Sequence, residues 1–302
     1  MLREGNSDRR APPLAVKNYA KKHPHRNKAF GEGSKTHVAT LGHDDFKANE
    51  KSWVSPGDDV LTIQHVSADG QVTVLKENLK VLPGEIVDAT FLNAAALDAF
   101  LAETLAEAKA EDVLYSVHLK ATMMKVSDPI IFGHVVRAYF KDVFDQYGEQ
   151  LAAAGLTAND GLGSILAGLS GLEGGEEIAE AFSRAMANGP RLSYVNSDKG
   201  GITNLHVPSD VIVDASMPAL IRNGGKLWGG KDGGEDDTLA VIPDSSYAGV
   251  YQATIEDVIA NGPLDPATIG TVPNVGSWRR PPRSTAATTR RSRSRRTAPS
   301  RS

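Results

Sequence analysis

The sequence contains no cysteine, few aromatic residues and no long hydrophobic run. Without cysteine among its 302 residues, the chain can form neither disulfides nor thiolate metal sites, as is common in a reducing cytoplasm. Aromatic residues make up 6%, so a core must be built mainly from Ala, Val, Leu and Ile. The sequence has no run of 18 apolar residues, so it predicts no membrane span. The charged start MLREGNSDRR does not resemble a secretory signal. We therefore expect a cytoplasmic chain with no membrane partner.

Positive charge is distributed unevenly. Residues 277–302 hold nine arginines and no acidic residue, while residues 1–276 carry 24 basic and 37 acidic residues, a net charge of −13. An arginine-rich tail can bind the phosphates of nucleic acid. Against that hypothesis, the tail has no aromatic residue besides Trp278, and the rest of the chain is acidic. No nucleic-acid partner is expected.

Alternating strand and helix patterns indicate an α/β fold with a mixed or parallel sheet flanked by helices. Residues 60–66 and 71–75 read as two strands of a β-hairpin joined by an Asp-Gly turn. Asn93 is expected to cap a helix, and residues 129–147 show the periodicity of a second amphipathic helix. Residues 155–190 are rich in Gly and Ala and predict little. Their Gly161-Leu162-Gly163 follows no strand, so it is not interpreted as a phosphate loop.

The stretch VLYSVHLKATMMKVSDP, residues 113–129, is the first candidate for chemistry. Its apolar start predicts an interior strand that ends near Lys120, and Ser127-Asp128-Pro129 predicts the start of a helix. Ligands of α/β proteins collect at the carboxyl ends of strands. Lys120 is therefore a candidate site residue, with a solvated lysine as the equally weighted alternative.

Two later units repeat one pattern. In VIVDASMPALIR, residues 211–222, and in AVIPDSSYAGVYQATIED, residues 240–257, an apolar run is followed by an aspartate, small residues and a helix. Asp214 and Asp244 each stand where a helix cap or an oxygen ligand of a hard divalent cation belongs. Capping is the commoner use of such an aspartate, and the pattern alone leaves both interpretations open for each residue.

The N-terminal segment holds a second kind of candidate. Arg3, Arg9 and Arg10 lie within eight positions, and guanidinium groups bind carboxylates in a bidentate manner. A disordered terminus is the alternative. Further along, His23-Pro24-His25 lacks the additional ligands of a zinc site.

Several stretches together resemble the monomeric NADP-dependent isocitrate dehydrogenases. They are LREGNSDRRAP, VKNYAKKHPH, SVHLKATMMKVSDPI, NSDKGGITNLHVPSDVIVDASMPA, VIPDSSYAGVYQ and GTVPNVG. The resemblance spans residues 2–276, which we interpret as part of the large, substrate- and metal-binding domain of that family. One departure is Gly200-Gly201, where the family usually has a single glycine.

The resemblance implies a function, namely oxidative decarboxylation of isocitrate to 2-oxoglutarate and CO2, a step of the tricarboxylic acid cycle. It implies that Arg3 and Arg9 bind the carboxylates of isocitrate, that Lys120 is the catalytic lysine, and that Asp214 is a ligand of Mg²⁺ or Mn²⁺. It also implies NADP as cofactor, although no NADP-binding residue is identified, and a monomeric full-length enzyme. A lysine can serve as base only if burial or nearby cations lower its pKa from about 10.4.

The resemblance also implies that parts of the site are missing. The family's catalytic tyrosine, its second aspartate group and most of its NADP pocket would follow residue 276, so we expect the chain alone to be inactive. A non-catalytic module that binds tricarboxylates is the alternative. Residues 277–302 are rich in Arg, Ser, Thr and Pro, as expected when G+C-rich coding DNA is read in a shifted frame. With suitable codons, a shift of one nucleotide restores the peptide that the family has after VPNVG, and the family's tyrosine then spans the codons of Ser284 and Thr285. We expect this tail to be disordered.

Overall fold

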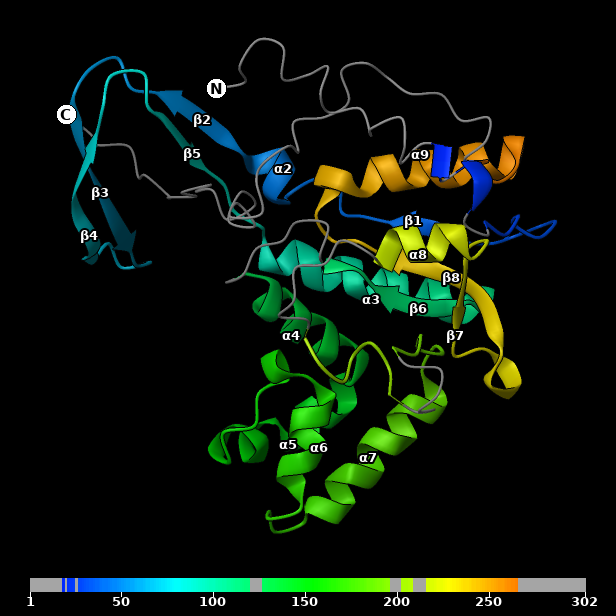
Figure 1. The fold of residues 1–302 in the computed structure, drawn as a ribbon. Helices are drawn as coiled ribbons and strands as arrows, with labels where there is room; N and C mark the ends of the chain where they lie inside the picture. The colour runs from blue at the N-terminus through cyan, green and yellow to red at the C-terminus, as the bar shows by residue number, and fades with distance from the viewer. Residues whose placement is uncertain are drawn as a thin grey trace.

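The computed structural model describes residues 18–19, 21–24, 27–119, 127–195, 202–208 and 216–265. In Figure 1, helices cover both sides of a central sheet, a further group of helices lies below it, and two β-ribbons extend to one side. No helix within these residues is long and apolar enough to cross a membrane. The α/β class predicted from the sequence is confirmed.

The central sheet is mixed, as predicted. Its parallel strands are ordered β1 (His37–Ala39), β8 (Glu235–Val241) and β6 (Leu114–Val117). Strand β7 (Lys226–Trp228) pairs antiparallel with β8 across the short turn η4 (Lys231–Gly233). The predicted strand near Lys120 is therefore β6, and it ends at Val117, three residues before Lys120, which lies outside the described residues.

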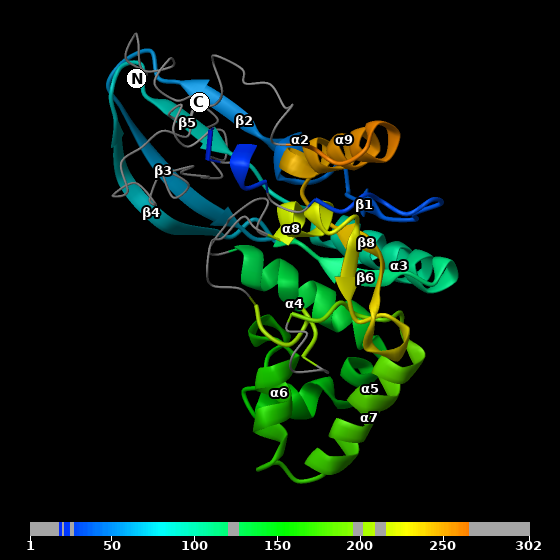
Figure 2. The ribbon, with the colours of Figure 1, turned by 45° about the vertical axis from the view of Figure 1, so that its right-hand side comes forward.

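Strand β8 sits between two hydrophobic clusters because alternate side chains of a strand point to opposite faces. Leu239 and Val241 belong to the larger cluster, with residues of α3 (Ala94–Glu111) and α4 (Ser127–Tyr139). Ala240 and Ile242 belong to the smaller cluster, with residues of α8 (Ser216–Arg222) and α9 (Ser245–Asn261). Figures 1 and 2 show these two helix pairs on opposite sides of the sheet. Burial on both faces explains the uninterrupted apolar run in this strand.

Helix α3 begins where the sequence predicts. The Asn93 side chain accepts hydrogen bonds from the backbone N–H groups of Ala95 and Ala96 at 3.0 and 3.4 Å. The helix ends at Asp112, which adopts a left-handed conformation with φ 57°. Leu97 and Leu101 on its inner face are fully buried.

The single helix predicted over residues 129–147 is wrong. Two helices occupy this region, α4 (Ser127–Tyr139) and α5 (Lys141–Ala153), and they separate at Phe140, with φ −105° and ψ 33°. The buried ring of Phe140 packs edge to face on Phe182, with centroids 5.0 Å apart. No proline or glycine marks the break, so tertiary packing and not a local sequence signal accounts for it.

The Gly- and Ala-rich region that predicted little contains η3 (Ala158–Asp160), α6 (Leu162–Leu169) and α7 (Gly175–Asn188). The N–H groups of Leu162 and Gly163 donate to the carbonyls of Leu205 and His206 at 3.0 and 2.8 Å. A Cβ on Gly161 would lie 2.4 Å from the His206 oxygen. The glycine pair thus allows close approach of two backbone segments, as expected for a pair that is not a phosphate loop.

Two ribbons extend from the body in Figures 1 and 2. After the short helix α2 (Phe46–Asn49), strand β2 (Lys51–Val54) pairs with β5 (Ile86–Ala89), and β3 (Asp59–Val66) pairs with β4 (Val72–Val81). The predicted hairpin is confirmed, with Gly70 at φ 84° in its turn. Its second strand continues beyond the predicted end to Val81.

Candidate functional site

A pocket of about 470 Å³ lies at the carboxyl end of β6. The ends of β6, the starts of α4 and α8, and the segments around residues 194 and 204 form its walls. Its lining combines apolar side chains with hydroxyl, amide, imidazole and carboxylate groups: Ser116, Val117, His118, Leu119, Asp128, Pro129, Phe132, Ser193, Tyr194, Val195, Thr203, Asn204, Val207, Pro208, Ser216, Ala219 and Leu227. Its volume is within the range of small-molecule sites. No lysine or arginine is among the described residues that line it.

A short hydrogen-bonded network forms the polar part of this pocket. Ser193 Oγ donates to Ser116 Oγ at 2.8 Å, and Asn204 Nδ2 donates to the same oxygen at 3.1 Å. The backbone joins the same elements, because Tyr115 N–H donates to Arg191 O and Ser193 N–H to Tyr115 O. The segment after α7 therefore runs beside β6 and presents Ser193 to the pocket.

His118 connects the end of β6 to the start of α8. Its backbone N–H donates to Val241 O at 2.8 Å, which continues the β6–β8 pairing past Val117. Its ring Nδ1 lies 3.0 Å from Ser216 Oγ, at hydrogen-bonding distance. His118 is buried, and sequence analysis did not single it out, because one histidine after a strand is not by itself a signal.

Of the predicted site residues, Arg3, Arg9, Lys120 and Asp214 all lie outside the described residues, as does the Gly200-Gly201 departure. For Lys120 and Asp214, residues close by in the sequence are described and line the pocket. Leu119, which precedes Lys120, and Ser216, two positions after Asp214, line the same pocket. The structure thus brings together Leu119 and Ser216, the described residues closest in sequence to Lys120 and Asp214. Arg3 and Arg9 have no described neighbour in the sequence.

Asp244 is a helix cap. Its Oδ2 accepts from Ser246 N–H at 3.2 Å at the start of α9, and its Oδ1 accepts from Lys47 N–H at 3.0 Å in α2. Asp45 does the reverse: it accepts from Ala48 N–H and from Ser245 N–H, both at 2.8 Å. The two buried carboxylates cap each other's helices, so the capping interpretation of Asp244 is confirmed and the metal-ligand alternative is not supported.

His206 anchors the segment that ends at residue 208 beside the pocket. Its Nδ1 accepts from Thr203 N–H at 3.0 Å and lies 2.9 Å from Thr203 Oγ1. Burial lowers the pKa of the His206 imidazole below its ordinary value of 6.5. The ring is therefore neutral near pH 7 and serves as a hydrogen-bond acceptor.

Comparison with known proteins identifies the family to which this arrangement belongs. The profile described as "Monomeric isocitrate dehydrogenase" matches residues 1–280. The chain belongs to the monomeric isocitrate dehydrogenase family. Among curated relatives, "Isocitrate dehydrogenase [NADP]" of Corynebacterium glutamicum is 63% identical over 276 residues, and that of Azotobacter vinelandii is 52% identical over 278 residues. The resemblance noted in the sequence is thereby confirmed.

The match covers 91% of this chain and 37% of each of these relatives. The chain therefore spans little more than a third of the length of the isocitrate dehydrogenases it matches. The profile ends at residue 280, inside the arginine-rich stretch that begins at residue 277. The division of the chain at residue 276 and the frameshift origin of the tail stay predictions, because residues 266–302 lie outside the described residues.

The pocket suits a divalent cation in its chemistry, although the described residues alone do not build a metal cage. No group of three or more His, Asp or Glu side chains placed to hold an ion occurs in the described part of this isocitrate dehydrogenase-family chain. The wall does offer hydroxyl and amide oxygens, and Asn204 Oδ1 is buried with no hydrogen-bond partner among the described residues. Mg²⁺ and Mn²⁺ prefer oxygen ligands, so the oxygens of this lining are of the type that these ions bind.

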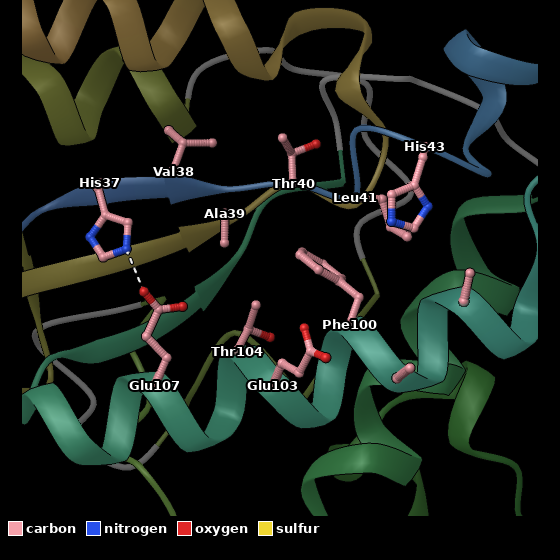
Figure 3. Close-up of a pocket in the computed structure, with 12 residues that line it drawn as sticks. His37, Val38, Ala39, Thr40, Leu41, His43, Phe100, Glu103, Thr104 and Glu107 are labelled. Carbon is pink, nitrogen blue, oxygen red and sulfur yellow. Dashed lines mark hydrogen bonds and ion pairs between the residues drawn. The ribbon is translucent and has the colours of Figure 1, made fainter.

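A second pocket, of about 480 Å³, lies between β1 and α3. Figure 3 shows His37 pointing from β1 toward Glu107 of α3, with their atoms Nε2 and Oε1 3.0 Å apart. The other ring nitrogen of His37 is 2.8 Å from Lys35 O. Both nitrogens of this imidazole are engaged, so neither is left to bind a metal, and the family resemblance assigns no role to this pocket.

Proposed function

We propose that this chain carries the isocitrate- and metal-binding part of an NADP-dependent isocitrate dehydrogenase, which converts isocitrate to 2-oxoglutarate and CO2. Family membership supports the reaction class. The observation that supports the location is that Leu119 and Ser216, the described residues next to Lys120 and close to Asp214, line one pocket. The substrate, NADP, and Mg²⁺ or Mn²⁺ are parts of this proposal, as is the monomeric state of the full-length enzyme.

The composition of the pocket explains why the proposed cations are needed. Its described lining has no lysine or arginine and one carboxylate, Asp128, so by itself it would repel a tricarboxylate. Arg3 and Arg9 would bind carboxylates of isocitrate through charge-assisted hydrogen bonds and hold it in one orientation. Lys120 would accept the proton of the C2 hydroxyl as the alcohol is oxidised.

Asp214 would hold the divalent ion by a carboxylate oxygen. When bound, such an ion polarises the C2 oxygen and stabilises the negative charge that decarboxylation leaves on the substrate. The ion's presence would also favour the neutral form of a nearby lysine, because two cations in one site repel each other.

No described residue is assigned to NADP. At the start of α6, between Gly161 and Gly163, the first N–H groups are bonded to the carbonyls of Leu205 and His206. Those donors are not available to a phosphate.

Calorimetric titration of the 302-residue chain with isocitrate in the presence of Mn²⁺ tests this proposal. Saturable binding that requires the metal is expected, and no NADPH absorbance should develop after NADP⁺ is added, because the chain spans 37% of its relatives. Lack of binding would contradict the proposal. Normal NADPH formation would show instead that the chain is a complete enzyme.

A non-catalytic tricarboxylate-binding module is the second candidate function. It predicts the same titration curve, but no turnover even when the remainder of a full-length relative is supplied as a second polypeptide. Recovery of NADPH formation in that mixture would favour the enzyme.

A further inference from the structure

One hydrogen bond joins the two elements whose neighbouring sequence carries the proposed lysine and metal ligand. It runs between His118 Nδ1 and Ser216 Oγ, 3.0 Å apart. The two residues are 98 positions apart in the chain, and their backbones are held by different parts of the fold. A contact of this kind fixes relative position across the pocket in a way that local secondary structure cannot.

The His118 end of this contact is rigid. The residue is buried, and its N–H continues the ladder between β6 and the central strand β8 through Val241 O. The second half of β8, residues 238–241, is itself buried between two clusters. The position of His118 is therefore fixed by the sheet.

The Ser216 end is less constrained by its own helix. Helix α8 has seven residues, and helices this short have little stability without tertiary contacts. Met217 and Leu220 pack in the smaller cluster on the far face of the sheet, which fixes the depth of the helix. The bond from Ser216 to His118 fixes the start of α8 relative to the end of β6.

We propose that His118 is a positioning residue that, through Ser216, holds the start of α8 against the end of β6 and so sets the shape of the pocket proposed to bind isocitrate and its cation. This inference rests on the proposed function of Lys120 and Asp214. His118 is two positions before Lys120, and Ser216 is two positions after Asp214. Residues behind metal ligands typically change metal affinity by about 10- to 100-fold when removed, and we expect an effect of that size on Mn²⁺–isocitrate binding.

The test is a set of variants of the full 302-residue chain, measured by Mn²⁺–isocitrate titration and by thermal unfolding. His118→Leu and Ser216→Ala remove the bond. His118→Asn and Ser216→Thr keep a polar atom near the same place. His118→Leu and Ser216→Ala are each expected to weaken binding at least tenfold. The double variant should bind no more weakly than the single variants, because both changes remove the same bond. His118→Asn and Ser216→Thr should each weaken binding less than threefold.

Tyr139→Phe is the matched control. It removes another partly buried hydrogen bond, from the Tyr139 hydroxyl to Pro190 O at 2.7 Å, and Tyr139 does not line the pocket. This variant is expected to lower the unfolding temperature and leave the affinity unchanged.

The outcomes separate the two proposals. If the unmodified chain does not bind Mn²⁺–isocitrate, the proposed function fails and the positioning role fails with it. If the chain binds, and His118→Leu and Ser216→Ala lose only thermal stability, as the control does, the positioning role alone is wrong. Additive losses in the double variant would also refute it, since they would mean that the two residues act separately.

Discussion

The ring Nδ1 of His118 and the hydroxyl of Ser216 lie 3.0 Å apart in the lining of the pocket at the end of β6. One side of this contact belongs to the parallel sheet and the other to a helix on its second face. The carboxyl end of a parallel strand is where ligands of α/β proteins bind. This contact therefore places the start of α8 at the edge of the sheet that the fold favours for chemistry.

The reciprocal caps formed by Asp45 and Asp244 give a prediction about stability. Asp244→Ala leaves the N–H groups of Lys47 and Ser246 without their acceptor. We expect the free energy of unfolding to fall by about 1–3 kcal/mol, measured by urea denaturation. Because the carboxylate is a cap and not a metal ligand, adding Mn²⁺ should stabilise the variant and the unmodified chain equally. A loss of Mn²⁺ stabilisation in the variant would contradict the assignment.

The close approach at Gly161 gives a second prediction. Its φ is +86°, and a Cβ there would lie 2.4 Å from the carbonyl oxygen of His206. Gly161→Ala should therefore destabilise the chain by more than about 2 kcal/mol. Gly249→Ala is the control, since Gly249 lies inside α9 with nothing within 4 Å of the added carbon. That change should stabilise the chain by about 0.5–1 kcal/mol, and equal effects at the two positions would count against the described packing.

The third prediction concerns pH and His206. Burial lowers the pKa of this imidazole in the folded chain, so the unfolded chain binds the proton more readily. The stability that the neutral ring provides is complete above about pH 6.5 and is lost as the pH falls below that value. His206→Asn keeps an acceptor for Thr203 N–H and cannot titrate. The unfolding temperature of the unmodified chain should fall relative to this variant between pH 7 and pH 5; parallel curves would refute the prediction.

The fourth prediction concerns Arg9, which the family resemblance places on a substrate carboxylate. Arg9→Ala should weaken isocitrate binding by about 10- to 100-fold, because a hydrogen bond to a charged group contributes about 1.5–3 kcal/mol. Arg184→Ala is the control: Arg184 forms an exposed pair with Glu180 within α7, and such pairs contribute little. Titration with Mn²⁺ present measures both, and equal affinities for the two variants would exclude Arg9 from the site.

The fold was predictable where local chemistry decides the structure. Asn93 and Asp244 cap helices as their sequence positions indicate, and the Asp-Gly turn forms the hairpin between β3 and β4. The break at Phe140 was not predictable, because its cause is a contact with Phe182, 42 positions later. The helices of residues 158–188 were missed for a related reason: Gly and Ala give weak periodicity, and Gly161 and Gly163 serve close packing with the segment around His206.

The candidate site also has a part that the sequence predicts and a part that it does not. Lys120 and Asp214 follow from strand-end positions and from the family resemblance, and their own placement lies outside the described residues. The network of Ser116, Ser193 and Asn204 carries no sequence signal, because its members come from three separate segments that only the folded sheet brings together. His118 is a similar case, since its partner Ser216 is 98 positions away.

The central claim is that one pocket, at the carboxyl end of β6, holds isocitrate and its divalent cation. A crystal structure of the chain grown with Mn²⁺ and isocitrate, with anomalous data collected at the manganese edge, measures this most directly. We predict one anomalous peak in the pocket lined by Ser116, His118, Asn204 and Ser216, with tricarboxylate density beside it. A peak elsewhere on the chain, for instance between β1 and α3, would contradict the claim, as would an empty pocket in a fully occupied crystal.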